Sequence, residues 1–260
     1  MSSDIILPIT NDPAETAPNV AALATREDFA RFMMSYKFGL DEVMTKVNIL
    51  KEEFMYIHDY SPIEHVHSRL KSPESILLKA QRKKCPLTID EIRTGISDIA
   101  GIRITCSFVA DTYVIRDMLT SQDDISVITE KDYIANPKEN GYQSLHLIVE
   151  VPVFMSDRVE PVRVEIQIRT VAMDFWASVE HKIYYKYDGE VPEELLQELK
   201  DAAVSVTSLD KKMERLYGEV AKLAEGSPPP ARGAISLESL QRLPLPEGLM
   251  EAYRKQQRDR

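Results

Sequence analysis

The stretch of sequence that decides the fold is Val162-Arg163-Val164-Glu165-Ile166-Gln167-Ile168-Arg169. Aliphatic and polar residues alternate strictly along it, which predicts a β-strand with one buried and one polar face. Glu165, Gln167 and Arg169 share the polar face, because side chains two residues apart lie on the same side of a strand. We therefore expect a sheet in the middle of the protein whose polar side chains meet water or a ligand.

Helices and further strands surround this strand in the sequence. Two apolar runs rich in β-branched residues predict strands at 102–109 and 144–153. Helical patterns separate or flank them at 89–96, 112–119 and 171–187. The expected fold class is therefore α+β, with a mixed β-sheet flanked by helices.

Two long apolar seams predict long N- and C-terminal helices. Apolar residues recur three and four positions apart at 29–57 and again at 195–223. The second seam continues through about four heptads, which is long for a lone surface helix. Its partner is either the rest of the same chain or another copy, and the spacing leaves both alternatives open.

Composition limits the class of protein. The 260 residues are 43% apolar with a net charge of -10, which disfavours non-specific nucleic-acid binding. We expect a loose tail at 1–24, one folded unit at 25–224, and a Pro-containing linker with a polar tail at 225–260. Cys85 and Cys106 are too few for a disulfide framework. No secretion signal or membrane-spanning run is expected, so a cytoplasmic location fits.

A basic segment in this acidic chain predicts a phosphate-binding helix. Arg69, Lys71, Lys79 and Arg82 fall within one short stretch, and Ser72-Pro73 between them is typical of a helix start. Amide groups at a helix N-terminus attract anions, and the basic side chains would add to that attraction. A solvated basic helix is the alternative interpretation.

Two acids suggest a metal site. Asp98 precedes the strand predicted at 102–109, Gly101 allows a tight backbone turn into it, and Glu165 lies on the polar face of another strand. Mg²⁺ binds through one or two carboxylates together with substrate phosphates. The pair next to the basic segment therefore predicts a magnesium site, although an isolated acid at a strand end is more often a surface residue.

A loop before the strand at 144–153 has the residues of a base-binding site. Asn140 precedes Gly141 at a turn, Tyr142 offers a flat ring, and Lys138 and His146 supply charge and hydrogen-bonding groups. A plain hairpin turn is the alternative.

Together these motifs resemble the synthetase domain of the RelA/SpoT family, and the chain length is similar to that of the stand-alone small alarmone synthetases. The motifs that match occur in order between about Tyr60 and Tyr187. They are Arg69-x-Lys71-Ser72-Pro73-Glu74-Ser75-Ile76-x-x-Lys79-x-x-Arg82, Asp98-Ile99-Ala100-Gly101-Ile102-Arg103, Asn140-Gly141-Tyr142-x-Ser144-Leu145-His146, Glu165-Ile166-Gln167-Ile168-Arg169-Thr170, and Trp176-Ala177 through Glu180-His181.

The resemblance implies a nucleotidyltransferase-like fold and transfer of pyrophosphate from ATP to the ribose 3′-hydroxyl of GDP or GTP, with GMP as a further acceptor, releasing AMP. Catalysis would depend on Asp98 and Glu165, which would also hold Mg²⁺. The implied ATP-binding residues are Arg69, Lys71, Ser75, Lys79, Arg82 and Arg103. The implied GDP- or GTP-binding residues are Lys138, Asn140, Tyr142, His146, Gln167 and Ala177.

Two other functions and one assembly question stay open. A related enzyme that pyrophosphorylates the 3′ end of tRNA would share the motifs, but the net charge disfavours it. A non-catalytic regulator that binds guanine nucleotides or RNA would have lost a carboxylate, and both are present. Small members of the family commonly form tetramers, so we expect a homotetramer with the seam at 195–223 contributing to contacts between chains.

Overall fold

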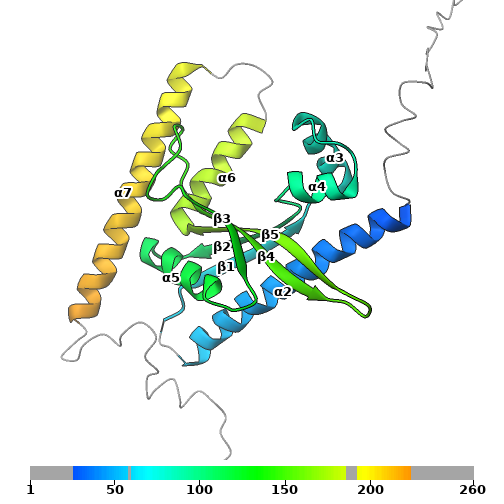
Figure 1. Cartoon of the computed structure of the whole chain (residues 1–260). Coiled ribbons are helices and arrows are strands. Elements are labelled where there is room, and N and C mark those ends of the chain that lie inside the picture. Colours follow the sequence, from blue (N-terminus) through cyan, green and yellow to red (C-terminus); the bar gives the residue numbers. More distant parts are fainter. Residues whose placement is uncertain (1–25, 58–59, 186–191, 224–260) are drawn as a thin grey trace, which may run out of the picture.

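The computed structural model describes residues 26–57, 60–185 and 192–223. The tail predicted at 1–24 and the linker and tail predicted at 225–260 lie outside the described residues. In chain order the elements are α2 (Arg26–Ile57), β1 (Ile63–Leu70), α3 (Pro73–Arg82), α4 (Ile89–Gly95), β2 (Ala100–Cys106), α5 (Val109–Thr120), β3 (Ser126–Asp132), β4 (Leu145–Phe154), β5 (Val159–Thr170), α6 (Val171–Tyr185) and α7 (Glu193–Leu223) (Figure 1).

The five strands form one mixed sheet in the order β1-β2-β5-β4-β3. β2 and β5 are parallel, and the other three neighbouring pairs are antiparallel. The strand that decides the fold, β5, lies at the centre, with Val164, Ile166 and Ile168 fully buried. The predicted α+β class with a mixed sheet is confirmed.

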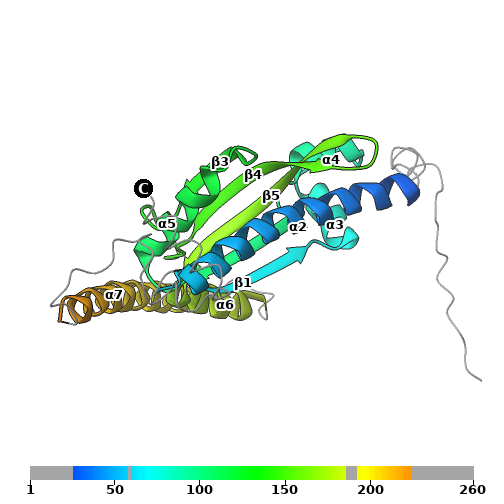
Figure 2. The same cartoon turned by 90° about the horizontal axis from the view of Figure 1, so that it is seen from below.

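The apolar seam at 29–57 belongs to the core. Phe32, Tyr36, Val43 and Val47 along α2 are buried against the apolar face of the sheet. Gly39 lies so close to Val162 of β5 that an added Cβ would be 2.6 Å from its Cγ1. α2 runs along the sheet, as the view from below shows (Figure 2). None of the helices that the structure describes has both the length and the apolar character to cross a membrane.

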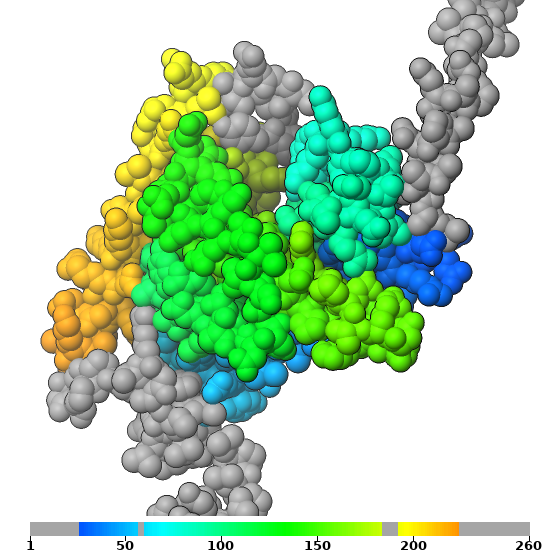
Figure 3. Space-filling view, viewed as in Figure 1, coloured from blue at the N-terminus to red at the C-terminus, as the bar shows by residue number. Residues whose placement is uncertain are grey.

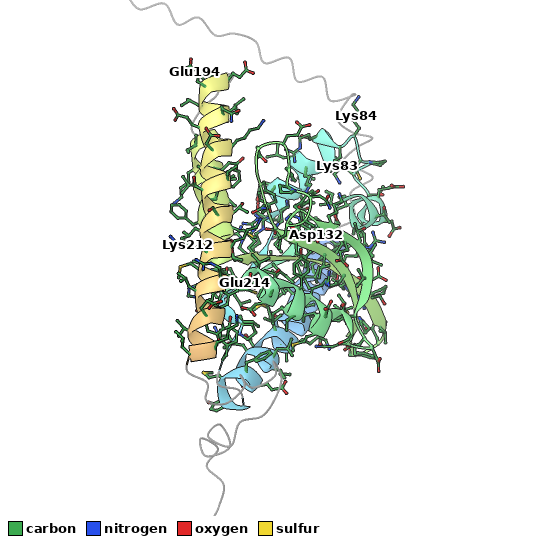
Figure 4. All side chains as sticks on the ribbon, turned by 90° about the vertical axis from the view of Figure 1, so that its left-hand side faces the viewer. Lys83, Lys84, Asp132, Glu194, Lys212 and Glu214 are labelled. Carbon is green, nitrogen blue, oxygen red and sulfur yellow. The ribbon has the colours of Figure 1, made fainter. Side chains whose placement is uncertain are left out.

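The seam on α7 is mostly exposed in the single chain. A neighbouring stripe of α7 packs on the rest of the protein. This stripe includes Ala203 and Asp210, which are both buried. Leu209 and Leu216 of the seam are 51% and 40% exposed. Figure 4 shows Glu214 on the side of α7 next to the body, where its carboxylate accepts a hydrogen bond from an amide of α5. Packing within the chain therefore leaves much of this seam uncovered.

Two strands were not predicted, and one was predicted too long. β1 and β3 lie at the edges of the sheet, where most side chains are exposed and no apolar alternation develops. The strand expected at 102–109 ends at Cys106, since Phe108 is the N-cap of α5 and its amide donates to Asp111. Val109 therefore begins a helix.

Candidate active site

The polar face of the central sheet gathers residues from three strands. Glu165 of β5 lies beside Gly101 of β2, and Gln167 lies beside Arg103. Across the other side of β2, Arg69 of β1 pairs with Gly101. The strand register therefore brings together residues that are far apart in the sequence.

These residues line a pocket of about 180 Å³. A Cβ at position 101 would lie 3.6 Å from Arg69 Nε, which is an ordinary contact distance, so Gly101 faces the Arg69 side chain at this pocket. Arg69 and Arg103 stand at this pocket together with Glu165 and Gln167. His67 of β1 also lines it, although the residues of β1 show no apolar alternation that would predict a strand.

The basic segment forms the predicted helix. Ser72 caps α3, its hydroxyl accepting from the Ser75 amide at 3.3 Å, and Pro73 occupies the first turn. In the space-filling view the surface is hollowed between the cyan lobe, which holds α3 and α4, and the green loop before β4 (Figure 3). Arg82 is exposed in the last turn of α3. The capped helix start predicted from Ser72-Pro73 is confirmed.

Lys71 and Lys79 converge on Asp98. Their Nζ atoms donate to Asp98 Oδ2 at 2.8 and 2.5 Å. Burial alone would raise the pKa of Asp98, but these two ammonium groups hold it below its usual value. The other oxygen, Oδ1, is buried and has no hydrogen-bond partner among the described residues. Oδ1 of Asp98 therefore has unused capacity to accept a hydrogen bond or a cation.

Glu165 has a different environment from Asp98. Its carboxylate accepts from Gln167 Nε2 at 3.1 Å and lies 3.9 Å from His146 Nδ1. The two acids contact different residues, so their sharing of one metal ion stays a prediction. Within the described residues there is no group of three or more His, Cys, Asp or Glu side chains that could hold a metal.

The loop before β4 presents Tyr142. Gly141 adopts a φ of +87°, which favours glycine, and the Asn140 side chain accepts from the Tyr142 amide at 3.1 Å. Asn140 also donates to Glu180 of α6 at 3.1 Å. Lys138 Nζ lies 4.9 Å from the centre of the Tyr142 ring. The turn is therefore held to α6 and carries a cation beside an aromatic ring.

Arg169 organises this region, although it was not predicted as a site residue. Its Nη2 donates to the Tyr142 hydroxyl at 2.5 Å and to Gln167 Oε1 at 2.7 Å, and its Nε donates to Ser144 at 3.3 Å. The residue is 4% exposed, and Asp174 provides an ion pair at 3.1 Å. The alternation of β5 placed Arg169 on the polar face, but its contacts depend on the fold around it.

His146 is held neutral at the centre of these contacts. Burial, and then the charges of Arg169, Lys138 and Lys131, lower its pKa to about 4. The Tyr142 hydroxyl accepts from Arg169, so its own proton can be donated to His146 Nε2 at 2.7 Å. That assignment places the imidazole proton on Nδ1, the atom that approaches Glu165.

Ala177 belongs to a small apolar cluster against which the loop before β4 packs. It is buried with Trp176 of α6 and Ala203 of α7, and Tyr142 packs against this small cluster. Trp176 Nε1 donates to the Leu199 carbonyl of α7 at 3.1 Å. Three further residues of the region were not predicted as site residues, although Glu180 lies within a matched motif: Tyr133, Asp174 and Glu180.

Comparisons with known proteins agree with these features. A family model described as a region found in RelA / SpoT proteins matches residues 68–190. The chain is 51% identical to the GTP pyrophosphokinase YwaC of Bacillus subtilis (strain 168) over 194 residues, which cover 75% of this chain and 92% of that protein. The structure resembles that of small alarmone synthetase 1 from Bacillus subtilis bound to its product pppGpp, with a TM-score of 0.68, 41% identity and coverage of 75% and 98% of the two chains. The same synthetase bound to AMPCPP gives a TM-score of 0.63 at 40% identity, with 75% and 99% covered.

Proposed function

Because this chain belongs to the RelA/SpoT family, we propose that it is a GTP pyrophosphokinase that transfers the β,γ-pyrophosphate of ATP to the ribose 3′-hydroxyl of GDP or GTP and releases AMP. The observation that carries this proposal is the polar face of the sheet, where the arginine-lined pocket and the Tyr142 loop lie on either side of Glu165 and Gln167. Two nucleotides held on these two sides would meet near Glu165. The proposed setting is the cytoplasm, which suits the free thiols of Cys85 and Cys106.

The ATP side uses stacking and charge. Guanidinium groups stack on aromatic faces, so Arg69 and Arg103 at the pocket suit an adenine ring between them. Ser75 at the capped start of α3, with Lys71 and Lys79, would meet the phosphates, and Arg82 one turn further would add charge. Lys71 and Lys79 both form ion pairs with Asp98, so their ammonium groups lie close together and could bind adjacent phosphates of a polyphosphate.

Magnesium suits the acids of this site. The unpartnered Oδ1 of Asp98 and the carboxylate of Glu165 are hard oxygen donors, and Mg²⁺ takes one or two such donors together with phosphate oxygens. Asp98 and Glu165 would hold the ion, and its positive charge would offset the negative charge that develops during transfer. Small alarmone synthetase 1 from Bacillus subtilis has been solved with pppGpp and with AMPCPP bound.

The acceptor side positions the attacking hydroxyl. Tyr142 would stack on the guanine, with Lys138, Asn140 and His146 around it and Ala177 beneath. In the reaction the 3′-oxygen forms a bond to the β-phosphorus, the bond from that phosphorus to the α-phosphate oxygen breaks, and AMP leaves. The hydroxyl proton passes to Glu165, which Gln167 orients through its amide.

An acceptor panel tests this function. Purified protein is incubated with labelled ATP, Mg²⁺ and GMP, GDP, GTP or tRNA in turn, and the products are separated by chromatography. We expect labelled pyrophosphate on GDP and GTP with equimolar AMP. Transfer to tRNA alone would identify the tRNA enzyme instead, and nucleotide binding without any product would identify a non-catalytic regulator.

Tyr142→Ala is expected to raise the KM for the guanine acceptor by about tenfold or more, because stacking on one base contributes about 1–3 kcal/mol. The KM for ATP should change much less. Tyr142→Phe keeps the ring and should be mild, although it loses the hydroxyl contacts to Arg169 and His146. Tyr56→Ala, at a half-exposed position on α2, is the control. Equal changes in both KM values would make Tyr142 a structural residue of the turn.

We also propose that the protein forms a homotetramer and that the exposed seam of α7 contributes to the contacts between its subunits. Leu209→Glu with Leu216→Glu should shift the mass in light scattering towards a folded monomer of 29.6 kDa. The control is Lys211→Glu with Lys212→Glu, which changes the charge of the same exposed helix outside the seam. A monomeric wild type would end this proposal, and an unfolded seam variant would place the seam in the core.

A further inference from the structure

One carboxylate oxygen joins two arginines that serve different parts of the proposed site. Asp174 lies in the first turn of α6, and its Oδ1 is 3.2 Å from Arg103 Nη1 and 3.1 Å from Arg169 Nη1. Arg103 lines the pocket proposed for ATP, whereas Arg169 holds the Tyr142 hydroxyl in the proposed acceptor loop. A continuous set of polar contacts thus runs from one proposed nucleotide site to the other.

Arg103 is paired with Asp174 through an ion pair at 3.2 Å. Burial and the nearby charge of Arg169 lower the pKa of Arg103, which shows that the two guanidinium groups disfavour one another. Its Nε is buried without a hydrogen-bond partner among the described residues. The Asp174 carboxylate offsets the repulsion between the guanidinium groups of Arg103 and Arg169. A displacement of either group therefore changes the electrostatic energy of the other.

Arg169 passes such a change directly to the acceptor loop. Its guanidinium carbon lies 5.1 Å from the centre of the Tyr142 ring, and its Nη2 donates to the hydroxyl of the same ring. The side chains of Arg169 and Asp174 are 5% and 23% exposed, so water screens the ion pair between them weakly, whereas the Arg103 side chain is 37% exposed and its pair is screened more. The orientation of Tyr142 is therefore tied to the ion pair.

We propose that Asp174 is a positioning residue that couples the two nucleotide sites, so that ATP held by Arg103 strengthens binding of the guanine nucleotide at Tyr142, and the reverse. This inference rests on the proposed function. Coupling between two binding sites is reciprocal, so each nucleotide must change the affinity of the other by the same factor. Contacts that form one physical network are the expected route for such coupling, and only measured coupling establishes it.

Isothermal titration calorimetry tests the proposal. The affinity for AMPCPP, whose methylene replaces the oxygen that must leave, is measured with and without saturating GDP, and the affinity for GDP with and without AMPCPP. In the wild type we expect a mutual increase of about fivefold or more. Asp174→Asn should reduce that factor to near one while each nucleotide still binds alone, and Asp174→Glu, which restores the charge, should recover part of it.

The control is Asp117→Asn, which removes an exposed ion pair to Arg116 on α5, away from both proposed nucleotide sites, and should keep the full factor. Absence of coupling in the wild type overturns the proposal without any variant. Full coupling in Asp174→Asn also overturns it, as does selective loss of GDP binding in that variant, which would make Asp174 a direct ligand. If neither nucleotide binds to the wild type, the proposed function fails instead.

Discussion

The Glu165→Gln and Asp98→Asn variants are each expected to lose at least about 100-fold in turnover while keeping the native fold. Each change removes one negative charge and keeps the shape of the side chain. Glu165 lies on the polar face of β5, and Asp98 faces Lys71 and Lys79, so neither substitution opens a cavity in the apolar core. Turnover falls because Glu165→Gln removes the proposed proton acceptor and a metal ligand, and Asp98→Asn removes a proposed metal ligand.

Product formation by chromatography and circular dichroism of each variant check this expectation. Glu150→Gln, which removes an acid paired with Arg163 elsewhere in the sheet, is the control for Glu165, and Asp117→Asn serves for Asp98. Near-normal turnover in either active-site variant would remove that residue from the proposed chemistry.

Gly141→Ala is expected to lower the free energy of unfolding by about 2–4 kcal/mol and to raise the acceptor KM. The φ of +87° disfavours any residue with a Cβ, and the added atom would lie 2.5 Å from the Cβ of Ala203 on α7. Either the loop or the helix must move, and both contact Tyr142. Urea unfolding followed by circular dichroism measures the loss.

A second glycine provides a matched control for this substitution. Gly218 lies within α7, and nothing lies within 4 Å of the position that its Cβ would take. Gly218→Ala should therefore stabilise the protein by about 0.5–1 kcal/mol through helix propensity. Adding Ala203→Gly to Gly141→Ala should recover the part of the loss that comes from the overlap. If Gly141→Ala is as stable as the wild type, the loop and α7 are not packed as described.

What could be predicted from the sequence follows from local chemistry. The long run of apolar residues spaced three and four positions apart predicted α2, and the alternation in β5 predicted a central strand. Ser72-Pro73 predicted the start of α3. Edge strands β1 and β3 gave no such signal, because neither face of an exposed edge strand needs apolar residues.

The contacts of the site were harder to predict than its residues. Sequence reasoning named Asp98 and Glu165 as a pair, but the structure shows Asp98 between two lysines and Glu165 next to Gln167. Arg169 and Asp174 were not chosen because their partners come from β2, the loop before β4 and α6. Such contacts depend on the packing of elements that are far apart in the sequence, such as β2 beside β5, and no local pattern specifies that packing.

The parallel pairing of β2 with β5 determines when the site appears during folding. β4 and β5 form a local hairpin that closes at Phe154 and Val159, whereas β2 must bring Ala100 to Val164 across a long intervening chain. Contacts between distant residues form later than local ones. Since Gly101 and Arg103 come from one of these strands and Glu165 and Gln167 from the other, we expect a nascent chain on the ribosome to have no nucleotide pocket until this pairing is complete. A partly folded or partly degraded molecule would then consume no ATP.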